Sequence, residues 1–330
     1  MHAQILIVGC GSIGERHLRC FQRTGRAAVT ACDTNAALVE KMRQQYGVAG
    51  FTDLEAALAH QPFAAAVICT PAHTHIDIAL RLLRGGMGLL IEKPLSTGLD
   101  RTQALADEAA TSGRFVAVAY VYHSMPWLQA AREYLRAGSL GRPLQVAVTA
   151  GQHFPTYRPA YREIYYARHE TGGGAIQDAL THLVNAVEWL VGPTTRLHCE
   201  AAHQALEGVT VEDTVCVTAR NGDVLVSYAL NQFQAANETV IAIHGEQGSL
   251  KIEAHAQRWA VWPRGASAWE LHAGPAMERD DLFVAQANAF LDGLSGQPAS
   301  LCTLAEGIQT LRFNLAALES ARSGRPVEIL

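Results

Sequence analysis

One lysine of the chain lies where packing gives it no role. Lys93 stands between Glu92 and Pro94, directly after the wholly apolar run Gly88–Ile91. Runs of this kind form strands that are covered on both faces of a parallel sheet, and ligands bind at the carboxyl ends of strands in open α/β sheets. A cationic donor at that position can stabilise an alkoxide that develops during hydride transfer. We therefore predict that Lys93 is catalytic and that Glu92 and Lys93 lie beside a bound nicotinamide cofactor.

A glycine-rich turn with the sequence GCGSIG follows the first apolar run and begins a helical pattern. Gly9 permits a tight turn, Gly11 lets the backbone approach a pyrophosphate, and Gly14 lets the helix pack closely on the strand. The pyrophosphate then lies on the free N–H groups of the helix N-terminus, around Ser12 and Ile13. A glycine turn without a ligand is the alternative, and the strand and helix that flank the turn favour the dinucleotide site.

An acidic residue completes this pattern. Asp33 ends the second apolar run, where a carboxylate accepts hydrogen bonds from the adenosine ribose hydroxyls. Thr34 and Asn35 follow it, and neither supplies the positive charge that would receive a 2′-phosphate. The sequence therefore predicts NAD as the cofactor, with NADP disfavoured.

Thr70 and Pro71 end another strand-like run, and His75 follows in the first turn of a helical pattern. We place all three residues in the cofactor site, because they too follow the carboxyl end of a strand. A histidine in a first helical turn is otherwise a surface or capping residue, and the sequence does not decide between the two roles for His75.

A second group of chemical residues follows the three glycines at 172–174. Asp178 and His182 are four positions apart on a predicted helix and share one face, which Asn185 continues. A carboxylate that orients an imidazole is the arrangement of a general base with a pKa near neutrality. An ordinary surface pair is the alternative. We interpret the consecutive glycines as backbone that another group approaches closely.

The elements that must position these residues fall into two regions. The first 120 residues alternate strand-like and helical runs, as in a doubly wound parallel sheet. The strands are expected at 4–8, 27–32, 65–69, 88–91 and 115–120, and the helices at 13–23, 36–46, 74–84 and 101–111. We predict an N-terminal Rossmann domain over residues 1–122.

The remainder, residues 123–330, reads as an α+β domain with a large, mostly antiparallel, open-faced sheet. Its strands are expected at 144–150, 214–220, 223–233, 239–244, 249–253 and 258–262, and its helices at 126–137, 175–191, 281–293 and 304–321. Asn221-Gly222 between two strands is a strong hairpin signal. We expect the last helix to pack back towards the N-terminal domain.

The composition excludes several classes of protein. The 330 residues are 49% hydrophobic and 17% charged with a net charge of −5, so no basic surface for nucleic acid or membrane is indicated. The seven cysteines form no CxxC pair, so neither a metal site nor a disulfide framework is predicted. No signal peptide or membrane helix is recognised, and a cytoplasmic location is expected.

Together these motifs resemble the Gfo/Idh/MocA oxidoreductases, named after glucose–fructose oxidoreductase, inositol dehydrogenase and MocA. The matching motifs are GCGSIG at 9–14, TPAHTH at 70–75, IEKPLS at 91–96, GGGAIQDALTHLVNAVEWLVG at 172–192 and GEQGSLKIE at 245–253. The resemblance implies a Rossmann domain followed by a sheet domain whose free face makes homodimers or homotetramers. It also implies that Lys93, Asp178 and His182 form the catalytic group.

Two departures from the family pattern leave the substrate open. The family usually carries an Asn and an Arg after the last Rossmann strand, and here those positions are Val121, His123 and Ser124 before Met125-Pro126. The frequent acidic residue three positions after the histidine is Asn185. The segment 157–168 is rich in Tyr and Arg, which can stack on or donate to a polyhydroxylated sugar. A loop braced on a neighbouring subunit is the alternative. The substrate candidates are Tyr122, His123, Tyr157, Arg158, Tyr161, Arg168 and Asn185.

The sequence thus predicts an NAD(P)-dependent dehydrogenase or reductase that acts on CH–OH groups. Its substrate would be a small sugar, a polyol or a sugar derivative. The alternative is a catalytically silent protein of the same fold that senses a cofactor or a sugar, and such a protein has no need to keep Lys93, Asp178 and His182 together.

Overall fold

The computed structural model describes residues 2–163 and 165–329. The chain forms two compact units, Met1–Ser124 with Glu278–Ile308, and Met125–Met277 with Gln309–Leu330. The sequence predicts two domains, residues 1–122 and 123–330, and this division remains a prediction. In the described ranges, no helix combines the length and the apolar character that a membrane span requires.

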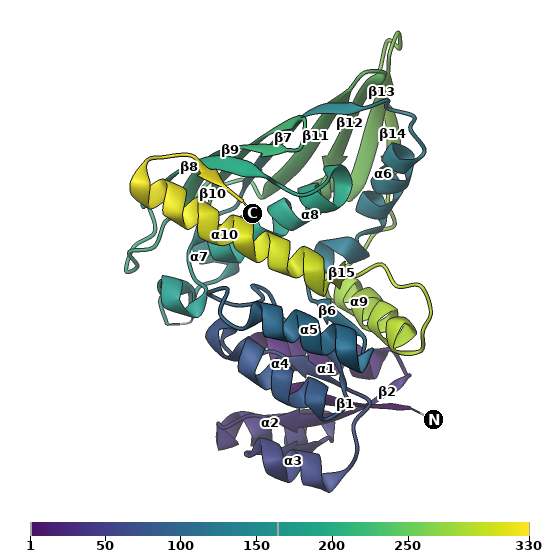
Figure 1. Cartoon of the computed structure of the whole chain (residues 1–330), viewed down its shortest axis with the longest axis vertical. Helices are drawn as coiled ribbons and strands as arrows, with labels where there is room; N and C mark the ends of the chain where they lie inside the picture. Colours follow the sequence, from purple (N-terminus) through teal and green to yellow (C-terminus); the bar gives the residue numbers. More distant parts are fainter. Residues whose placement is uncertain (1, 164, 330) are drawn as a thin grey trace. The chain divides into compact units, whose positions relative to one another are not determined.

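The first unit contains a seven-stranded sheet in the order β15-β6-β5-β4-β1-β2-β3. All neighbouring strands in it are parallel except β15, which pairs antiparallel with β6. The strands are β1 Ala3–Val8, β2 Ala27–Cys32, β3 Ala49–Phe51, β4 Ala65–Ile68, β5 Gly88–Ile91, β6 Val116–Val118 and β15 Cys302–Thr303. This is the doubly wound parallel sheet that the sequence predicts (Figure 1).

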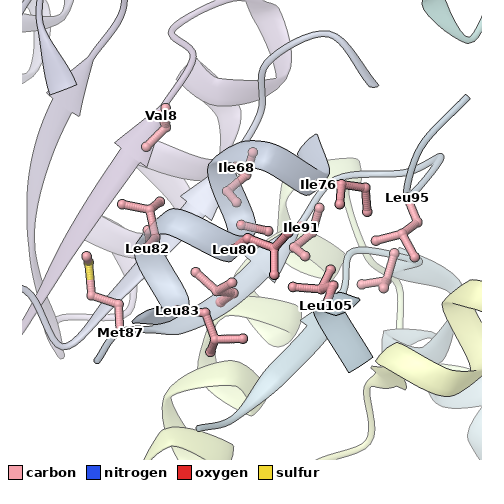
Figure 2. Close-up of a cluster of buried hydrophobic side chains, with 14 of the residues drawn as sticks. Val8, Ile68, Ile76, Leu80, Leu82, Leu83, Met87, Ile91, Leu95 and Leu105 are labelled. Carbon is pink, nitrogen blue, oxygen red and sulfur yellow. The ribbon is translucent and has the colours of Figure 1, made fainter. Parts of the chain in front are cut away.

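Helices cover both faces of this sheet because alternate strand residues point to opposite sides. Residues of α3, α4 and α5 pack on one face, as Figure 2 shows for the cluster around Ile68, Leu80 and Ile91. Residues of α1, α2 and α9 pack on the other face, where Phe21 and Phe290 meet. The helices are α1 Ser12–Arg23, α2 Ala36–Tyr46, α3 Leu54–His60, α4 His75–Arg84, α5 Thr102–Ser112 and α9 Arg279–Leu294.

The second unit contains a nine-stranded sheet in the order β14-β13-β12-β11-β7-β10-β9-β8-β16. Its pairs are antiparallel apart from β7 with β10, so the predicted mostly antiparallel sheet is confirmed. The strands are β7 Pro143–Gly151, β8 Arg196–Ala202, β9 Thr214–Asn221, β10 Val224–Asn231, β11 Glu238–Gly245, β12 Gly248–Glu253, β13 Arg258–Pro263, β14 Glu270–Ala273 and β16 Val327–Glu328.

Helices of this unit lie along one face of the sheet. Figure 1 shows α8 and α10 on the same side of it. The rings of Tyr228 on β10 and Phe313 on α10 meet at 5.8 Å between centroids, and the Ser320 hydroxyl accepts a hydrogen bond from the Cys199 backbone. The helices are α6 Pro126–Arg136, α7 Phe154–Tyr157, α8 Thr181–Val191 and, from Gln309 onward, α10 Leu304–Ser323.

The structure differs from the predicted elements at the start of one helix and in one hairpin. The helix expected over 175–191 begins with a π-helical turn, Ile176–Leu180, before α8. In the predicted hairpin, Asn221 pairs with Val224, so Gly222 and Asp223 form the turn. Asn221 remains in the strand because its buried side chain donates to the Gly192 carbonyl and accepts from Thr194.

Candidate active site

Four segments with chemical side chains or glycines follow neighbouring strands of the first unit. The glycine turn 9–14 follows β1, Asp33 follows β2, Thr70 comes two residues after β4, and Glu92 follows β5. The sheet order places these strands side by side, as β5-β4-β1-β2. The carboxyl ends of parallel strands meet at one edge, so the sheet brings the predicted cofactor residues of this unit together.

The three glycines of the turn have different physical roles. Gly9 has a φ of +94°, and a Cβ on it would lie 2.7 Å from the Cys69 carbonyl carbon. A Cβ on Gly14 would collide with the Gly9 carbonyl. Gly11 has a φ of −64° and no atom within 4 Å of the position of a Cβ, so the protein's own packing does not require glycine there. A ligand that approaches the backbone does require it, which fits a dinucleotide.

The helix that begins at this turn is open to an anion. Gly11 is the N-cap of α1 and has no side chain, so no side-chain hydrogen bond caps this end of the helix. Ser12 is exposed and Ile13 is half-buried at the first two helical positions. Backbone N–H groups at a helix N-terminus bind phosphate readily, because the helix dipole adds positive potential.

Asp33 connects the glycine turn to the end of β2. Its carboxylate accepts hydrogen bonds from the Cys10 backbone at 2.6 Å and from the Asn35 backbone at 2.8 Å. These bonds fix the carboxylate beside the turn. Each carboxylate oxygen has further acceptor capacity, so Asp33 can also receive ribose hydroxyls.

Glu92 is a buried carboxylate at the end of β5. One oxygen lies 2.7 Å from Nε2 of His17 on α1, and the other accepts the Lys93 backbone N–H at 3.0 Å. The side chain therefore fixes the backbone from which Lys93, which is half-buried, projects. The contact of His17 with Glu92 was not predicted, because a histidine in the second turn of a helix carries no motif that links it to a distant carboxylate.

His75 is buried and lies in the first turn of α4. Its Nε2 is 2.7 Å from the Thr70 carbonyl, so the ring braces the turn that contains Thr70 and Pro71. Burial lowers the pKa of the His75 imidazole, which keeps the ring neutral. The contact of His75 with the Thr70 carbonyl is a structural role. Contact of Thr70, Pro71 or His75 with a cofactor remains a prediction.

Tyr122 and His123 lie in the single-turn helix Val121–Ser124 that follows β6. His123 is fully buried, and burial raises the pKa of the Tyr122 phenol. Tyr122 packs beside Val121 and Phe283 in a small apolar cluster. These positions lie after the strand next to β5, and a contact with substrate stays a prediction for both.

Asp178 and His182, the other two predicted catalytic residues, lie in the second unit. Asp178 lies in the π-helical turn Ile176–Leu180 and is buried, while His182 lies in the first turn of α8 and is half-buried. π-helical turns within α-helices are frequent at functional sites. The Tyr165 hydroxyl donates to Oδ1 of Asp178 at 2.6 Å.

The glycines before this helix are required by the protein itself. A Cβ on Gly173 would collide with the Tyr166 carbonyl, and a Cβ on Gly174, whose φ is +88°, would lie 2.6 Å from the Glu212 carboxylate oxygens. Other groups do approach this backbone closely, and they are the Tyr166 carbonyl at Gly173 and the Glu212 carboxylate at Gly174. The Glu212 carboxylate accepts the Ile176 backbone N–H at 2.8 Å and caps the helix.

Glu212 also pairs with His169, whose Nε2 lies 2.5 Å from its second oxygen. The hydrogen bond to Glu212 raises the pKa of His169. Neither residue was predicted from the sequence, since their separation along the chain follows no motif. The run of glycines was the one sequence signal, and it indicates that another group lies close to this backbone but not which residue supplies that group.

Asn185 is buried between helices of the second unit. Its amide donates to the Thr310 hydroxyl at 3.0 Å, and the same hydroxyl donates to the Glu188 carboxylate at 3.0 Å. Burial raises the pKa of Glu188. The amide of Asn185 is therefore engaged in the contact between α8 and α10.

The candidates in the Tyr- and Arg-rich segment are placed differently from one another. Tyr157 and Arg168 are exposed and Arg158 is half-buried. Tyr161 is 1% exposed and donates its hydroxyl to the Glu207 carbonyl at 2.7 Å. Its ring packs against Phe154, so the structure places Tyr161 in the core of the unit instead of on a surface open to ligand.

Known protein families match both parts of the chain. Residues 3–120 match the model described as oxidoreductase family, NAD-binding Rossmann fold, and residues 128–251 match the GFO/IDH/MocA C-terminal domain.

Individual relatives are more distant in sequence and similar in fold. Myo-inositol dehydrogenase Hyg17 from Streptomyces leeuwenhoekii is 26% identical over 97% of this chain and 98% of its own. The structure of levoglucosan dehydrogenase in complex with NADH and levoglucosan has a TM-score of 0.88 at 19% identity, and covers all of both chains. The WlbA dehydrogenase from Bordetella pertussis, in complex with NADH and UDP-GlcNAcA, has a TM-score of 0.84 at 24% identity and covers 100% of this chain and 99% of its own.

Proposed function

Because the chain belongs to the Gfo/Idh/MocA family of NAD-binding oxidoreductases, we propose that it oxidises a secondary hydroxyl of a sugar, a polyol or a sugar derivative, or reduces the corresponding ketone. The observation that carries this proposal is the shared edge of the first sheet. There the glycine turn, Asp33, Thr70 and the Glu92-Lys93 pair follow the neighbouring strands β1, β2, β4 and β5. A dinucleotide turn alone would serve any NAD-dependent reaction, whereas a lysine that follows β5, two strands away from β1 in the sheet order, supports chemistry at a hydroxyl.

The roles of the residues follow from their charges. The Lys93 ammonium stabilises the negative charge on the substrate oxygen, and His182 accepts the hydroxyl proton. Asp178 orients the imidazole and stabilises its protonated form. NAD, when bound, supplies the acceptor for the hydride. In the reducing direction the same groups act in reverse, so that His182 returns the proton.

The cofactor preference is proposed from one carboxylate. Asp33 is held beside the glycine turn by two backbone N–H groups, so its charge stays at the place where the adenosine ribose binds in this fold. A 2′-phosphate would bring a second negative charge to this place. We therefore propose NAD, with NADP disfavoured.

The substrate class is proposed from the relatives and from exposed residues. The relatives above are named for an inositol and an anhydrosugar, and one was crystallised with a sugar nucleotide. Tyr157, Arg158 and Arg168 supply aromatic and guanidinium groups at or near the surface of the second unit, and such groups stack on and donate to polyhydroxylated molecules. Tyr122, His123 and Asn185 stay weaker candidates because they are less exposed.

A screen for NADH formation tests the proposed function. The wild-type protein is mixed with NAD and a panel of free aldoses, inositols, anhydrosugars and nucleotide-linked sugar acids, and the absorbance of NADH is followed. We expect turnover with at least one class and its loss in the Lys93→Ala variant. NADH binding without turnover on any member, in either direction, would instead favour a protein that senses a cofactor or a sugar. A cytoplasmic location and assembly into a homodimer or homotetramer are parts of the same proposal.

A further inference from the structure

One hydrogen bond ties the Tyr- and Arg-rich segment to the proposed catalytic residues. Tyr165 lies in the single-turn helix Tyr165–Ala167, and its hydroxyl donates to Oδ1 of Asp178 at 2.6 Å. Bonds of this length between a hydroxyl and a carboxylate are charge-assisted and stronger than those between neutral groups. The contact joins residues thirteen positions apart, within the second unit.

The backbone on the Tyr165 side of this bond is fixed by its neighbours. The Tyr165 carbonyl accepts the Thr171 hydroxyl at 2.6 Å. The next residue, Tyr166, is fully buried, packs its ring against Phe154 and bonds the Gln232 amide oxygen with its hydroxyl. A side chain on such an anchored backbone has few positions open to it, so the phenol of Tyr165 is held in place for its acceptor.

The Asp178 side is fixed as well. Its backbone N–H donates to the Gly174 carbonyl at 3.0 Å, and Glu212 caps the helix at Ile176 directly before it. Because both partners are anchored independently, the hydrogen bond sets the rotation of the Asp178 carboxylate more than it sets the fold. A carboxylate with one oxygen held by a donor presents its second oxygen in a defined direction.

We propose that Tyr165 is a positioning residue that acts through Asp178. By holding Oδ1, it fixes the rotation of a carboxylate that lies four residues before His182 on the same helix. A hydrogen bond donated to a carboxylate also favours its ionised form, and that negative charge stabilises a protonated imidazole. This inference rests on the proposed function, because it assigns Tyr165 a part in the same proton transfer.

Partial exposure of Tyr165 offers one competing role. The side chain is 43% exposed, so the phenol could contact substrate directly. The two roles differ in their kinetic consequences. A residue that acts only through Asp178 has no effect once Asp178 is gone, whereas a substrate contact keeps its effect.

The test is a double-mutant cycle on steady-state kinetics with the best substrate of the screen. Tyr165→Phe removes the hydroxyl and keeps the ring. We expect kcat to fall about 5- to 30-fold, with the KM for substrate and for NAD within about two-fold, because the lost bond acts on the transition state. In an Asp178→Ala background the same substitution should change kcat by less than about two-fold.

A matched control is Tyr134→Phe. Tyr134 lies on α6 in the same unit, and its ring packs against Trp259. It undergoes the same chemical change, and its kcat should stay within about two-fold of the wild-type value. Denaturant unfolding of every variant shows whether the fold is retained. If Asp178→Ala does not fold, Asp178→Asn replaces it, and the effect of Tyr165→Phe should be smaller there than in the wild type.

Three outcomes would overturn the inference. Independent, multiplying effects of Tyr165→Phe and Asp178→Ala would show a contact with substrate. A raised KM with an unchanged kcat would show the same. A fall in kcat that accompanies a large loss of stability would show a structural role. Failure of the proposed function is a separate result, since the wild-type protein would then bind NADH and turn over no member of the panel.

Discussion

At the scale of single residues, Asp33 carries the prediction of cofactor choice. We expect NAD(H) to bind at least about tenfold more tightly than NADP(H), which corresponds to about 1.4 kcal/mol. The physical reason is repulsion between the Asp33 carboxylate and a 2′-phosphate. Titration of intrinsic fluorescence with NADH and with NADPH measures both affinities.

The matched variant for this prediction is Asp33→Asn. It retains an acceptor for the Cys10 backbone N–H, which the carboxylate accepts at 2.6 Å, and it removes the charge. The discrimination against NADPH should shrink while the fold is kept. Equal or tighter binding of NADPH by the wild-type protein would contradict the role given to Asp33.

The catalytic prediction also belongs to single residues. Lys93→Ala removes the charge that stabilises the alkoxide, and His182→Ala removes the proton acceptor. Each should lower kcat by about 10²–10⁴-fold and leave NADH binding nearly unchanged. Asp178→Asn should be milder, because it keeps the helix and a partner for Tyr165 and spoils only the orientation of the histidine. Steady-state kinetics and NADH titration measure both quantities.

One result would refute this assignment directly. If Lys93→Ala turned over any wild-type substrate within a few-fold of the wild-type rate, the alkoxide would need no charge from this lysine. The Tyr134→Phe variant again controls for nonspecific loss of activity. Loss of NADH binding in His182→Ala would equally contradict a role confined to proton transfer.

At the scale of elements, the glycine turn before α1 allows binding to be separated from folding. Gly11→Ala places a methyl group where no protein atom lies within 4 Å, at a φ of −64° that alanine adopts easily. Stability should stay the same or rise by about 0.4–1 kcal/mol. The methyl group occupies the place of the pyrophosphate, so NADH affinity should fall at least about tenfold, or about 1.4 kcal/mol.

Gly14→Ala is the contrasting variant in the same turn. Its methyl group would collide with the Gly9 carbonyl, so it should destabilise the protein by about 1–3 kcal/mol. Urea unfolding and NADH titration of the two variants form one experiment. If Gly11→Ala bound NADH as the wild type does, the open space before Gly11 would not be the pyrophosphate site.

The same scale shows how far the sequence predicts the fold. The buried strands β1, β2, β4 and β5 were predictable, because a short continuous apolar run is typical of a strand that helices cover on both faces. Strand β3 and helix α3 were missed, since Ala49–Phe51 is only three residues long and Leu54–His60 only seven. Strand β8 was also missed. Its outward residues, such as Arg196 and Glu200, are charged, and they interrupt the apolar pattern.

The sequence predicts the residues of the candidate site that belong to a recognisable motif, and it does not predict the others. Gly9–Gly14, Asp33 and Lys93 stand in fixed relation to strand ends, which the sequence reveals. Glu212 and Tyr165 act on the helix of Asp178 through side-chain contacts. Such contacts depend on how loops pack, and no spacing along the chain encodes them. The π-helical turn could not be predicted either, because most of its residues also occur in ordinary α-helices.

At the scale of the whole molecule, the second sheet has one face that its helices do not bury. On β10 the residues Val224, Val226, Tyr228 and Leu230 are buried, while Leu225 on the opposite face is 50% exposed. Gln145 on β7 and Arg220 on β9 lie directly opposite Leu225 on this face. The outward residues further along these central strands are small or weakly polar. They are Thr149, Cys216, Thr218 and Ala229. A central, weakly charged surface of this kind suits contact with a second copy of the same sheet.

We therefore predict a homo-oligomer that this face holds together. Light scattering at micromolar concentration should give a mass of at least twice the 35.6 kDa of one chain. Leu225→Lys should shift the protein towards the monomer, because it buries a charge in an apolar contact. Leu99→Lys is the matched control. Leu99 is 44% exposed in a loop of the first unit, so the same change there should leave the mass unaltered.

The two variants separate this face from other sources of association. A monomeric mass for the wild-type protein would remove the proposed oligomer altogether. An oligomer that survives Leu225→Lys and dissociates in Leu99→Lys would move the interface to the first unit. Only dissociation by Leu225→Lys alone assigns the contact to the open face, because a lysine destabilises an interface only where burial prevents water from solvating its charge.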